Sequence, residues 1–361
     1  MFMYQKAVDV LKAEIASGQW KPGDSFLGVK AICARFQISH LTAVRVLECL
    51  KGLRLVESRR GAGTFIAQKR RLFGFLSPAF GLAPFFPLIR KEVSGLCQRN
   101  GITFEIHEID HIDRADYAAR LESAAHKIIE HGPSGIIYIP SANVTPFQDC
   151  ANPTDLVDRK ILATFDRASV PVVLVDSGLE SPLEERYDLV GVDNRAIGVK
   201  LGQHLLAQGA QRILFVSWRT NSPNVRNRLA GLREVADAAG KAFSSYVLSK
   251  SNLRDFRQKF KSPERPDAVV GSSDRVALMV LHLLQKVRMR IPEDVLLAGI
   301  DGIETAKDSN LTTVQQPFRE LARAACETLL NRIARPNALP RHLTIATTLL
   351  PRASTARTPF P

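Results

Sequence analysis

The sequence is poor in the features of secreted and membrane-spanning proteins. It has only five cysteines among 361 residues, widely spaced and without a CxxC pair. An odd number of scattered cysteines indicates reduced thiols rather than a disulfide framework. No apolar run approaches the roughly 18 residues needed to cross a bilayer, and the first residues lack the pattern of a signal peptide. We therefore expect a cytoplasmic protein without a membrane partner.

Catalytic signatures are also missing. The chain contains no GxxxxGK[ST], HExxH or GxSxG motif. Two histidine pairs, His107 with His111 and His126 with His131, lie on polar segments without a cysteine or third ligand nearby. We interpret them as solvated side chains rather than a metal site. These absences predict that the protein is not an enzyme and has no cofactor.

Positive charge is abundant and is concentrated at one end. The formal net charge is +13, and residues 1–71 hold 6 Lys and 7 Arg against 2 Asp and 3 Glu, a balance of +8. The other 290 residues therefore carry only +5. A small basic region on a near-neutral body predicts a polyanionic partner. An acidic membrane surface could also attract this basic region, so the local sequence pattern has to distinguish between the two kinds of partner.

The basic region has the pattern of three helices followed by two short strands. Ser39 is a typical N-cap for the third helix, and Arg45 faces away from the core side of that helix. Apolar spacing predicts helices around residues 4–15, 29–36 and 43–50, and strands at 53–57 and 64–67. This order predicts a winged helix-turn-helix.

Such a domain fits duplex DNA. Its third helix is narrow enough for the major groove, and the tip of its ribbon can reach an adjacent groove or the phosphates. Arg59 and Arg60 bring charge to the tip, and Gly61 lets backbone amides approach phosphate oxygens. The alternative is an ordinary basic hairpin packed on three helices.

The motifs of residues 4–67 resemble the GntR-type winged helix of bacterial transcription regulators. The resemblance is carried by residues 18–24 (GQWKPGD), 36–39 (FQIS) and 61–66 (GAGTFI). It implies DNA contacts at Lys30, Ser39, His40, Thr42, Arg60 and Gly61.

This region also departs from the usual GntR pattern. The usual arginine of the third helix stands one place later, at Arg45, and His40 replaces a common arginine. The operator preference of the family is therefore not carried over. Leu41 could contact a thymine methyl group or be an ordinary surface leucine.

From residue 72 the pattern changes to alternating strands and helices. The expected helices are 85–99, 116–131, 195–208, 226–239 and 275–287. The expected strands are short apolar runs at 72–76, 102–106, 135–139, 172–175, 189–192, 213–216, 268–270 and 295–300. Continuous apolarity indicates strands buried on both faces. The fold class is therefore α/β, a doubly wound parallel-sheet domain with two lobes.

In such sheets a ligand binds at the carboxyl ends of the strands. Asp176, Asp193, Ser273 and Asp301 follow strands, and Arg228 lies near the start of a helix. Carboxylates with an arginine and an aromatic residue suit a polyhydroxylated ligand. Each residue alone could instead be structural, and we expect Asp193 to be a helix cap.

Several motifs here resemble the effector-binding domain of LacI/GalR regulators, which is related to periplasmic sugar-binding proteins. They include residues 172–176 (VVLVD), 190–194 (VGVDN), 228–231 (RLAG) and 312–317 (TTVQQP), and the resemblance covers about 72–356. It implies two Rossmann-like lobes with a ligand in the cleft. The implied ligand residues are Phe85, Asp176, Arg228, Ser273, Asp301 and Gln316. The combination resembles the arabinose-responsive repressor type, a hybrid of the two families.

The expected organisation is a winged-helix domain at 1–67, a basic linker at 68–71, an effector and dimerisation domain at 72–356, and a tail at 357–361. We expect a transcription regulator that binds a pseudo-palindromic operator as a homodimer, controlled by a small molecule, most simply a sugar. The alternative is a cytoplasmic sugar-binding or enzyme-like α/β domain whose basic module binds another polyanion.

Overall fold

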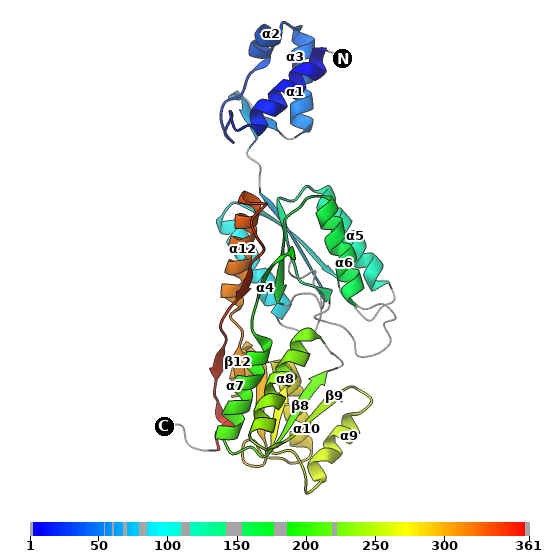
Figure 1. Cartoon of the computed structure of the whole chain (residues 1–361), viewed down its shortest axis with the longest axis vertical. Coiled ribbons are helices and arrows are strands. Elements are labelled where there is room, and N and C mark those ends of the chain that lie inside the picture. The colour runs from blue at the N-terminus through cyan, green and yellow to red at the C-terminus, as the bar shows by residue number, and fades with distance from the viewer. Residues whose placement is uncertain are drawn as a thin grey trace. The chain divides into compact units, whose positions relative to one another are not determined.

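The chain divides into two compact units, residues 1–71 and 72–361 (Figure 1). The computed structural model describes residues 3–53, 55–59, 61–67, 71–78, 85–109, 116–141, 154–176, 186–218 and 222–357. None of the helices in these ranges combines the length and the apolarity that a membrane crossing requires.

The N-terminal unit has three helices and a two-stranded ribbon. These are α1 (Met3–Ala16), α2 (Val29–Phe36), α3 (His40–Gly52), β1 (Val56–Arg59) and β2 (Gly63–Ile66). The helical faces expected from the apolar spacing enclose its core, with Leu11, Ile32 and Leu50 fully buried. The winged helix predicted from the sequence is therefore the observed arrangement.

The first ribbon strand is displaced from its predicted position. It was expected at residues 53–57 but occupies Val56–Arg59, paired antiparallel to β2. The reason is the end of α3, because the amides of Leu53 and Leu55 donate to carbonyls of the last helical turn, at Cys49 and Leu50. Leu53 and Leu55 thus bond to the end of the helix instead of starting the strand.

The C-terminal unit has two lobes, each built on a sheet of six strands within the described residues. The first sheet has the order β13-β7-β6-β5-β3-β4. Its strands are β3 (Leu72–Pro78), β4 (Thr103–Ile109), β5 (Gly135–Tyr138), β6 (Val172–Asp176), β7 (Asp188–Gly191) and β13 (His342–Thr344). All of these pairs are parallel.

The second lobe repeats this design. Its sheet has the order β14-β12-β11-β10-β8-β9. Its strands are β8 (Arg212–Trp218), β9 (Ala242–Leu248), β10 (Ala268–Gly271), β11 (Leu296–Asp301), β12 (Thr312–Gln315) and β14 (Thr348–Leu350). The parallel, two-lobed fold class is confirmed, with one exception, because β14 runs antiparallel to β12.

Three crossovers join the lobes and explain that exception. The chain passes from β7 to the second lobe, returns after β12, and leaves again from β13 to β14. Strand β12 runs toward the first lobe. Strand β14 runs away from it, because the chain passes from β13 of the first lobe into β14 without an intervening helix. The two strands must therefore be antiparallel where they pair.

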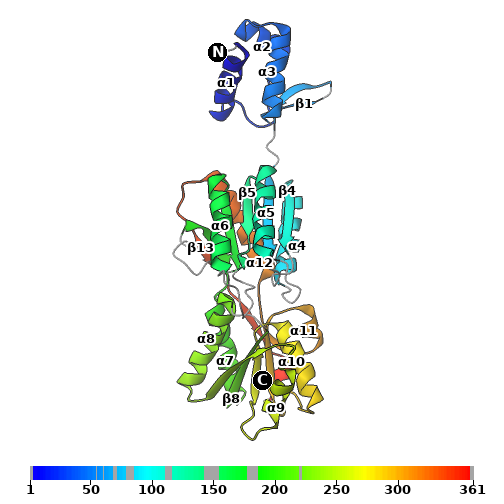
Figure 2. The same ribbon diagram turned by 90° about the vertical axis from the view of Figure 1, so that its right-hand side faces the viewer.

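Helices cover both faces of each sheet. Figure 1 shows α4 and α12 on one side of the first lobe and α5 and α6 on the other, and Figure 2 shows α7 and α8 opposite α10 in the second lobe. The first lobe has α4 (Phe85–Arg99), α5 (Tyr117–Glu130), α6 (Thr154–Arg167) and α12 (Phe318–Ala334). The second has α7 (Asn194–Ala207), α8 (Pro223–Ala238), α9 (Leu253–Gln258), α10 (Asp274–Lys286) and α11 (Glu304–Asp308).

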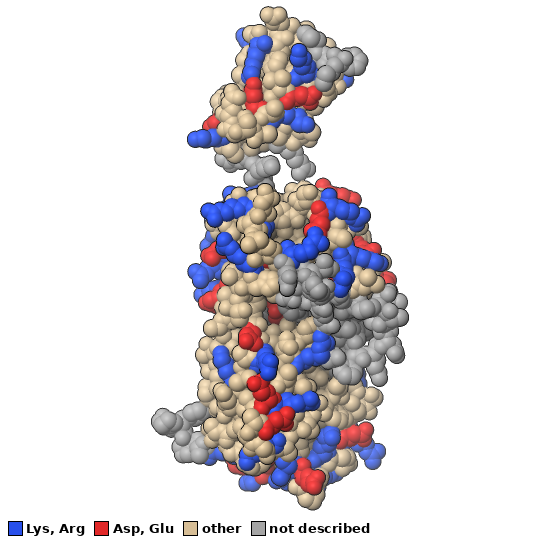
Figure 3. All heavy atoms as spheres, in the orientation of Figure 1, with Lys and Arg blue, Asp and Glu red and all other residues tan. Residues whose placement is uncertain are grey.

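Sequence reasoning missed several of these elements. Four helices, α6, α9, α11 and α12, and four strands, β9, β12, β13 and β14, were not predicted. Two of the missed strands, β9 and β13, are largely exposed edge strands, so they lack the continuous apolar run that marked the central strands. The face drawn in Figure 3 carries interspersed Lys, Arg, Asp and Glu over the C-terminal unit, in keeping with its small net charge.

Candidate functional site

The amino end of α3 exposes several of the predicted DNA-contacting residues. Ser39 caps the helix, because its Oγ accepts a hydrogen bond from the amide of Thr42 at 3.2 Å. The hydroxyls of Ser39 and Thr42 also lie 2.8 Å apart. His40 is exposed, Leu41 is 81% exposed, and Lys30 is exposed near the start of α2. The capping pair fixes the first turn from which His40 and Leu41 project.

Arg45 is exposed but is held in place. Its guanidinium lies over the ring of Tyr4 in α1, 4.8 Å from the ring centroid. Such a cation–π contact contributes about 0.5–1 kcal/mol at an exposed site. The contact keeps Arg45 on the outer face of α3, where the sequence placed it.

The ribbon holds Arg59 in a similar way. Its Nε and one terminal nitrogen donate to Glu57 Oε1 at 3.1 and 2.8 Å, and its guanidinium lies 4.5 Å from the ring centroid of Phe65. Gly61 at the tip has φ of 76°, a left-handed conformation that favours glycine. Arg60 lies outside the described residues.

The histidines form a different grouping from the predicted one. His107 Nε2 lies 2.5 Å from Glu105 Oε1, and His131 Nδ1 lies 2.8 Å from the same oxygen. These two side chains therefore share a carboxylate, which the sequence did not indicate, while His126 and His131 are exposed, as expected for solvated side chains. Among the described residues no cluster of histidine, cysteine and acidic side chains suits a metal ion.

A buried polar cluster lies at the carboxyl ends of strands from both lobes. Asp176 ends β6 in the first lobe and Asp301 ends β11 in the second. Arg228 of α8 is electrostatically coupled to both carboxylates. These three residues and Gln316 are at most 7% exposed. The structure therefore brings together four of the six predicted ligand residues.

Hydrogen bonds link the cluster across the lobes. Asn224 Nδ2 donates to Asp176 Oδ2 at 2.8 Å, and Asn194 Nδ2 donates to Asn224 Oδ1 at 3.0 Å. Arg228 Nε donates to Asn194 Oδ1 at 2.7 Å. Gln316 Nε2 donates to Asp301 Oδ1 at 2.8 Å. The first three bonds form one chain that joins Asp176 of the first lobe to Arg228 of the second.

Two acceptor atoms of this cluster have no hydrogen-bond partner among the described residues. They are Asp176 Oδ1 and Gln316 Oε1, and both are inaccessible to solvent. A buried acceptor left unsatisfied costs about 1–3 kcal/mol. Both atoms require donors, which the hydroxyl groups of a sugar would supply and a fully ionised phosphate group would not.

Backbone strain accompanies the two aspartates. Asp176 has φ of 81° and Asp301 has φ of 129°, a region that residues with a side chain rarely adopt. Such strain costs about 1–3 kcal/mol and persists at functional sites when the surroundings fix it. Asp274 fixes the chain after Asp301, because its Oδ2 accepts from the amides of Gly302 and Ile303 at 2.7 and 2.9 Å.

Burial also changes the charge of the aspartates. It raises the pKa of Asp176 to about 6, although the charge of Arg228 and the hydrogen bond from Asn224 lower it. It raises the pKa of Asp301 to about 7, where the negative charges of Asp274 and Asp176 add to the effect and Arg228 and Gln316 oppose it. Protonation near neutral pH is therefore part of the chemistry of this site.

Close packing of α7 against α8 positions Arg228. A Cβ on Gly198 would lie 2.1 Å from the carbonyl oxygen of Arg228, and one on Gly231 would lie 2.1 Å from that of Arg195. Only glycine lets the two backbones approach so closely. This contact explains the glycine of the RLAG motif and sets Arg228 beside Asn194.

The other predicted ligand residues differ in outcome. Ser273 caps α10, and its Oγ accepts from the amide of Val276 at 3.3 Å, so its role toward a ligand stays a prediction. The side chain of Phe85 lies outside the described residues. Asp193 caps α7 as expected, accepting from the amide of Ala196 at 2.8 Å.

Two members of the cluster, Asn194 and Asn224, were not among the predicted ligand residues. Asn194 follows a predicted strand directly after Asp193, so the sequence indicated its place at a strand end but assigned it no contact with a ligand. Asn224 precedes Arg228 by four residues, which places both on one face of a helix. That spacing was the signal that could have found it.

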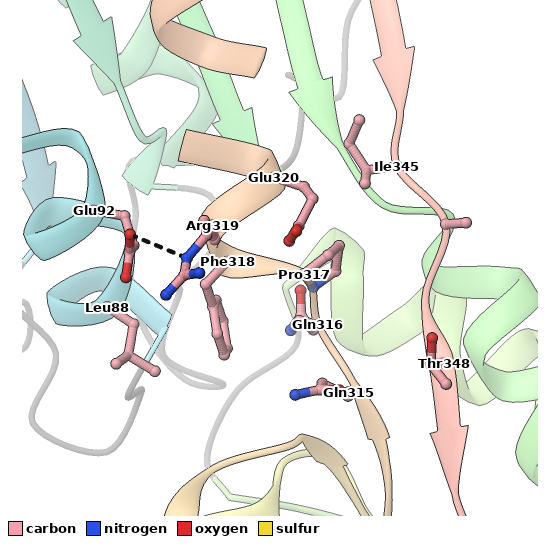
Figure 4. A pocket seen from close by; sticks show the side chains of 11 residues that line it. Leu88, Glu92, Gln315, Gln316, Pro317, Phe318, Arg319, Glu320, Ile345 and Thr348 are labelled. Atoms are coloured by element: carbon pink, nitrogen blue, oxygen red, sulfur yellow. Dashed lines mark ion pairs between the residues drawn. The ribbon is translucent and has the colours of Figure 1, made fainter. Parts of the chain in front are cut away.

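A cavity of about 590 Å³ lies where the crossovers meet (Figure 4). We call it the hinge cavity, and it is lined by Leu88, Glu92, Gln315, Gln316, Pro317, Phe318, Arg319, Glu320, Ile345, Ala346 and Thr348. Arg319 and Glu92 form an ion pair across it, with Nε and Oε2 3.7 Å apart. Gln316 belongs both to this cavity and to the buried cluster.

Two families match parts of the chain. Residues 3–66 match the bacterial regulatory proteins of the gntR family, and residues 203–355 match the periplasmic binding protein-like domain. The chain therefore combines the two domain types that its motifs predicted.

Curated relatives are transcription regulators. The ribose operon repressor of Escherichia coli (strain K12) is 30% identical over 205 residues, 54% of this chain and 60% of that protein. The HTH-type transcriptional regulator CelR of Thermobifida fusca is also 30% identical over 205 residues, 55% of this chain and 60% of that protein. The matches thus span about 60% of the length of these relatives.

Solved structures share the fold. A CelR–cellobiose complex has a TM-score of 0.64 at 23% identity and covers 88% of this chain and 92% of its own. A LacI family regulator from Enterococcus faecium with bound ribose has a TM-score of 0.63 at 22% identity, covering 80% and 100%. At these identities the likeness supports the two-lobed fold.

Proposed function

We propose that this chain is a ligand-controlled transcription regulator that binds a pseudo-palindromic DNA operator as a homodimer in the cytoplasm. Support comes from the joining of a basic winged helix to a two-lobed domain with a buried polar cluster. Two-fold symmetric proteins read two-fold symmetric sites, which is the reason for proposing a dimer. The relatives named above are regulators of the same kind.

The small molecule that best suits the cluster is a sugar. The observation that carries this proposal is the pair of buried acceptors, Asp176 Oδ1 and Gln316 Oε1, beside the guanidinium of Arg228. Sugar hydroxyls would donate to the two acceptors and accept from the guanidinium. Ribose and cellobiose occur in solved structures of similar fold and are reasonable first probes.

In the proposed mechanism, the ligand changes the affinity for operator DNA. Asp176 and Asp301 come from different lobes, so a ligand that contacts both favours one arrangement of the lobes. By linkage, the sugar must change DNA affinity by the same factor by which DNA changes sugar affinity. Equal sugar affinity with and without the operator would contradict this mechanism.

For DNA contact we propose a set of residues at the start of α2, on the first turns of α3 and on the ribbon: Lys30, Ser39, His40, Thr42, Arg45, Arg59, Arg60 and Gly61. We expect Arg45 to contact bases and the ribbon arginines to contact phosphates. Lys51 in the last turn of α3 carries the same charge and is a matched control for Arg45. Removal of either charge should weaken non-specific binding alike, but only Arg45→Ala should relax base preference.

The experiment that tests the function is capture of genomic fragments by the purified full-length chain at roughly physiological salt, where non-specific binding is weak. Recovery of a two-fold symmetric site, with altered base preference in Arg45→Ala and not in Lys51→Ala, would support the proposal. Failure to recover any specific site, with and without cell extract as a ligand source, would favour the alternative of a sugar-binding protein whose basic unit binds another polyanion.

A further inference from the structure

Three arginines of the N-terminal unit, Arg35, Arg45 and Arg59, lie over aromatic rings but differ in their other contacts. Arg35 and Arg59 each donate to a glutamate carboxylate through two nitrogen atoms. The side chain of Arg45 makes no hydrogen bond or ion pair with any described residue, and its described partner is the ring of Tyr4. Of these three arginines, Arg45 alone therefore keeps its N–H donors uncommitted.

The ring of Tyr4 is fixed by the core of the same unit. Tyr4 shares one face of α1 with Val8 and Leu11, at the i, i+4 and i+7 spacing of a helix. Val8 and Leu11 are fully buried, and the half-buried Tyr4 packs against the same core. Since α1 also packs against α3, the ring has a defined place beside the helix that carries Arg45.

Contact with a ring suits an arginine that reads a base. The ring attracts the guanidinium by its negative face, 4.8 Å from centroid to carbon, without the carboxylate that would neutralise the charge. Arg45 is exposed, on a helix whose core side is marked by the buried Ala43, Val46, Leu47 and Leu50. A guanidinium with free donors can bond to both O6 and N7 of a guanine in the major groove.

Holding Arg45 in advance also favours discrimination between bases. A free arginine side chain loses rotamer freedom when it binds, and a side chain that is already held loses less. A mobile guanidinium can turn to any nearby acceptor, including a phosphate. One held in a single orientation bonds well only to a base that presents its acceptors at the matching place.

We infer that Tyr4, which lies outside the set proposed for DNA contact, is a positioning residue that holds Arg45 in the orientation in which it reads a base pair. The inference rests on the proposed function and adds a residue of α1 that sets its selectivity. The ring of Phe65 beneath Arg59 has no equivalent role, because Glu57 already holds Arg59 through two hydrogen bonds.

The test measures the affinity of full-length variants for the recovered operator and for single-base-pair variants of it. Tyr4→Leu and Tyr4→Met each remove the ring and keep apolar bulk. At the base pairs whose discrimination Arg45→Ala relaxes, both should lower the discrimination about two- to fivefold. The salt dependence of binding should not change, because no charge is lost. Tyr4→Phe retains the ring and should discriminate as the unchanged chain does.

A double variant shows whether Tyr4 acts through Arg45. Once Arg45→Ala is present, Tyr4→Leu should lower the discrimination no further. Phe65→Leu removes the ring beneath Arg59 and is the matched control, which should leave discrimination at these base pairs unaltered. Circular dichroism and thermal unfolding check that each variant folds.

Three outcomes would overturn the inference and leave the proposed function intact. They are unchanged discrimination in the folded ring-free variants, an equal loss in Tyr4→Phe, and an equal further loss when Arg45→Ala is already present. If Arg45→Ala itself relaxed no base pair of the operator, Arg45 would be rejected as a reader of bases, and the inference with it.

Discussion

The two lobes present the same residue type at equivalent points of the same topology, yet in different electrostatic surroundings. Asp176 ends the third strand from the β13 edge, and Asp301 ends the third strand from the β14 edge. Both have positive φ. The backbone design therefore places two carboxylates symmetrically at the junction of the lobes.

The surroundings differ because the second lobe adds a third carboxylate. Burial, together with the negative charge of the neighbouring Asp274, raises the pKa of Asp301 to about 7. The pKa of Asp176 is raised only to about 6. The first lobe differs after the equivalent strand, β5. There the amide of Ser141 donates a hydrogen bond to Oδ1 of the buried Asp158 at 2.9 Å. Topology thus fixes where the two carboxylates lie, and the neighbouring side chains set the pH at which each carboxylate ionises.

The strongest test of this comparison removes the cation that both aspartates share. Arg228→Met should reduce sugar affinity by about 100-fold or more, since each hydrogen bond from a charged group to the sugar contributes about 1.5–3 kcal/mol. Sugar binding is measured by calorimetry and operator binding without sugar by gel shift, which should stay unchanged.

The control is Arg195→Met, in which an exposed ion pair with Glu234, 2.7 Å long, is lost. Exposed pairs contribute about 0–1 kcal/mol, so its sugar affinity should be unaltered. If Arg228→Met also abolished operator binding or cooperative unfolding, Arg228 would be a folding residue.

The next test separates the two aspartates. At pH 7 the carboxyl of Asp176, with a pKa of about 6, is mostly ionised, whereas that of Asp301, with a pKa of about 7, is about half ionised. Replacing an ionised acceptor with an amide removes a charge-assisted hydrogen bond. We therefore expect about tenfold weaker sugar binding in Asp176→Asn and about threefold in Asp301→Asn at pH 7. Equal losses would show that the lobes do not differ in charge.

The pH dependence sharpens the same difference. Both pKa values exceed the ordinary value of 3.8, so the folded chain holds protons that the unfolded chain releases. Ligand-free stability should therefore fall as pH rises from about 4 to about 7 and then level off. Thermal or denaturant unfolding at several pH values measures this trend.

Sugar affinity should change in the opposite sense, because hydroxyl donors bind carboxylate better than carboxylic acid. We expect it to rise about fivefold between pH 5.5 and 8 and to level off about one pH unit above the pKa of Asp301, near pH 8. In Asp301→Asn the rise should finish lower, near the pKa of Asp176 at about 6. An unshifted profile in that variant would assign the titration to another group.

The smallest expected effect concerns Ser273, which follows β10 in the second lobe. Ser273→Ala removes the N-cap of α10 and should lower the free energy of unfolding by about 1 kcal/mol. If its hydroxyl also donates to the sugar, affinity should fall about two- to threefold. Calorimetry and denaturant unfolding on the same sample separate the two roles, and unchanged affinity would leave Ser273 as a cap only.

Much of this architecture could be predicted from local pattern. The caps at Ser39 and Asp193, the three helices of the basic unit and the buried central strands follow from helical spacing, capping chemistry and continuous apolar runs. Edge strands such as β9 and β13 could not, because their half-exposed pattern resembles that of loops. The direction of β14 depends on a crossover that has no local signal.

The sequence by itself determined which side chains follow the buried strands, because the end of a continuous apolar run is a local property. Asp176 and Asp301 were found in this way, Arg228 by its place near the start of a helix, and Gln316 through the resemblance to LacI/GalR regulators. Only the tertiary structure decided that Asn194 and Asn224 complete the network, that two acceptors stay unpaired, and that Gln316 opens onto a cavity. These three features depend on how closely α7 packs against α8 and on where the two lobes meet. Both are set by contacts between segments far apart in the sequence, so no single stretch of sequence indicates them.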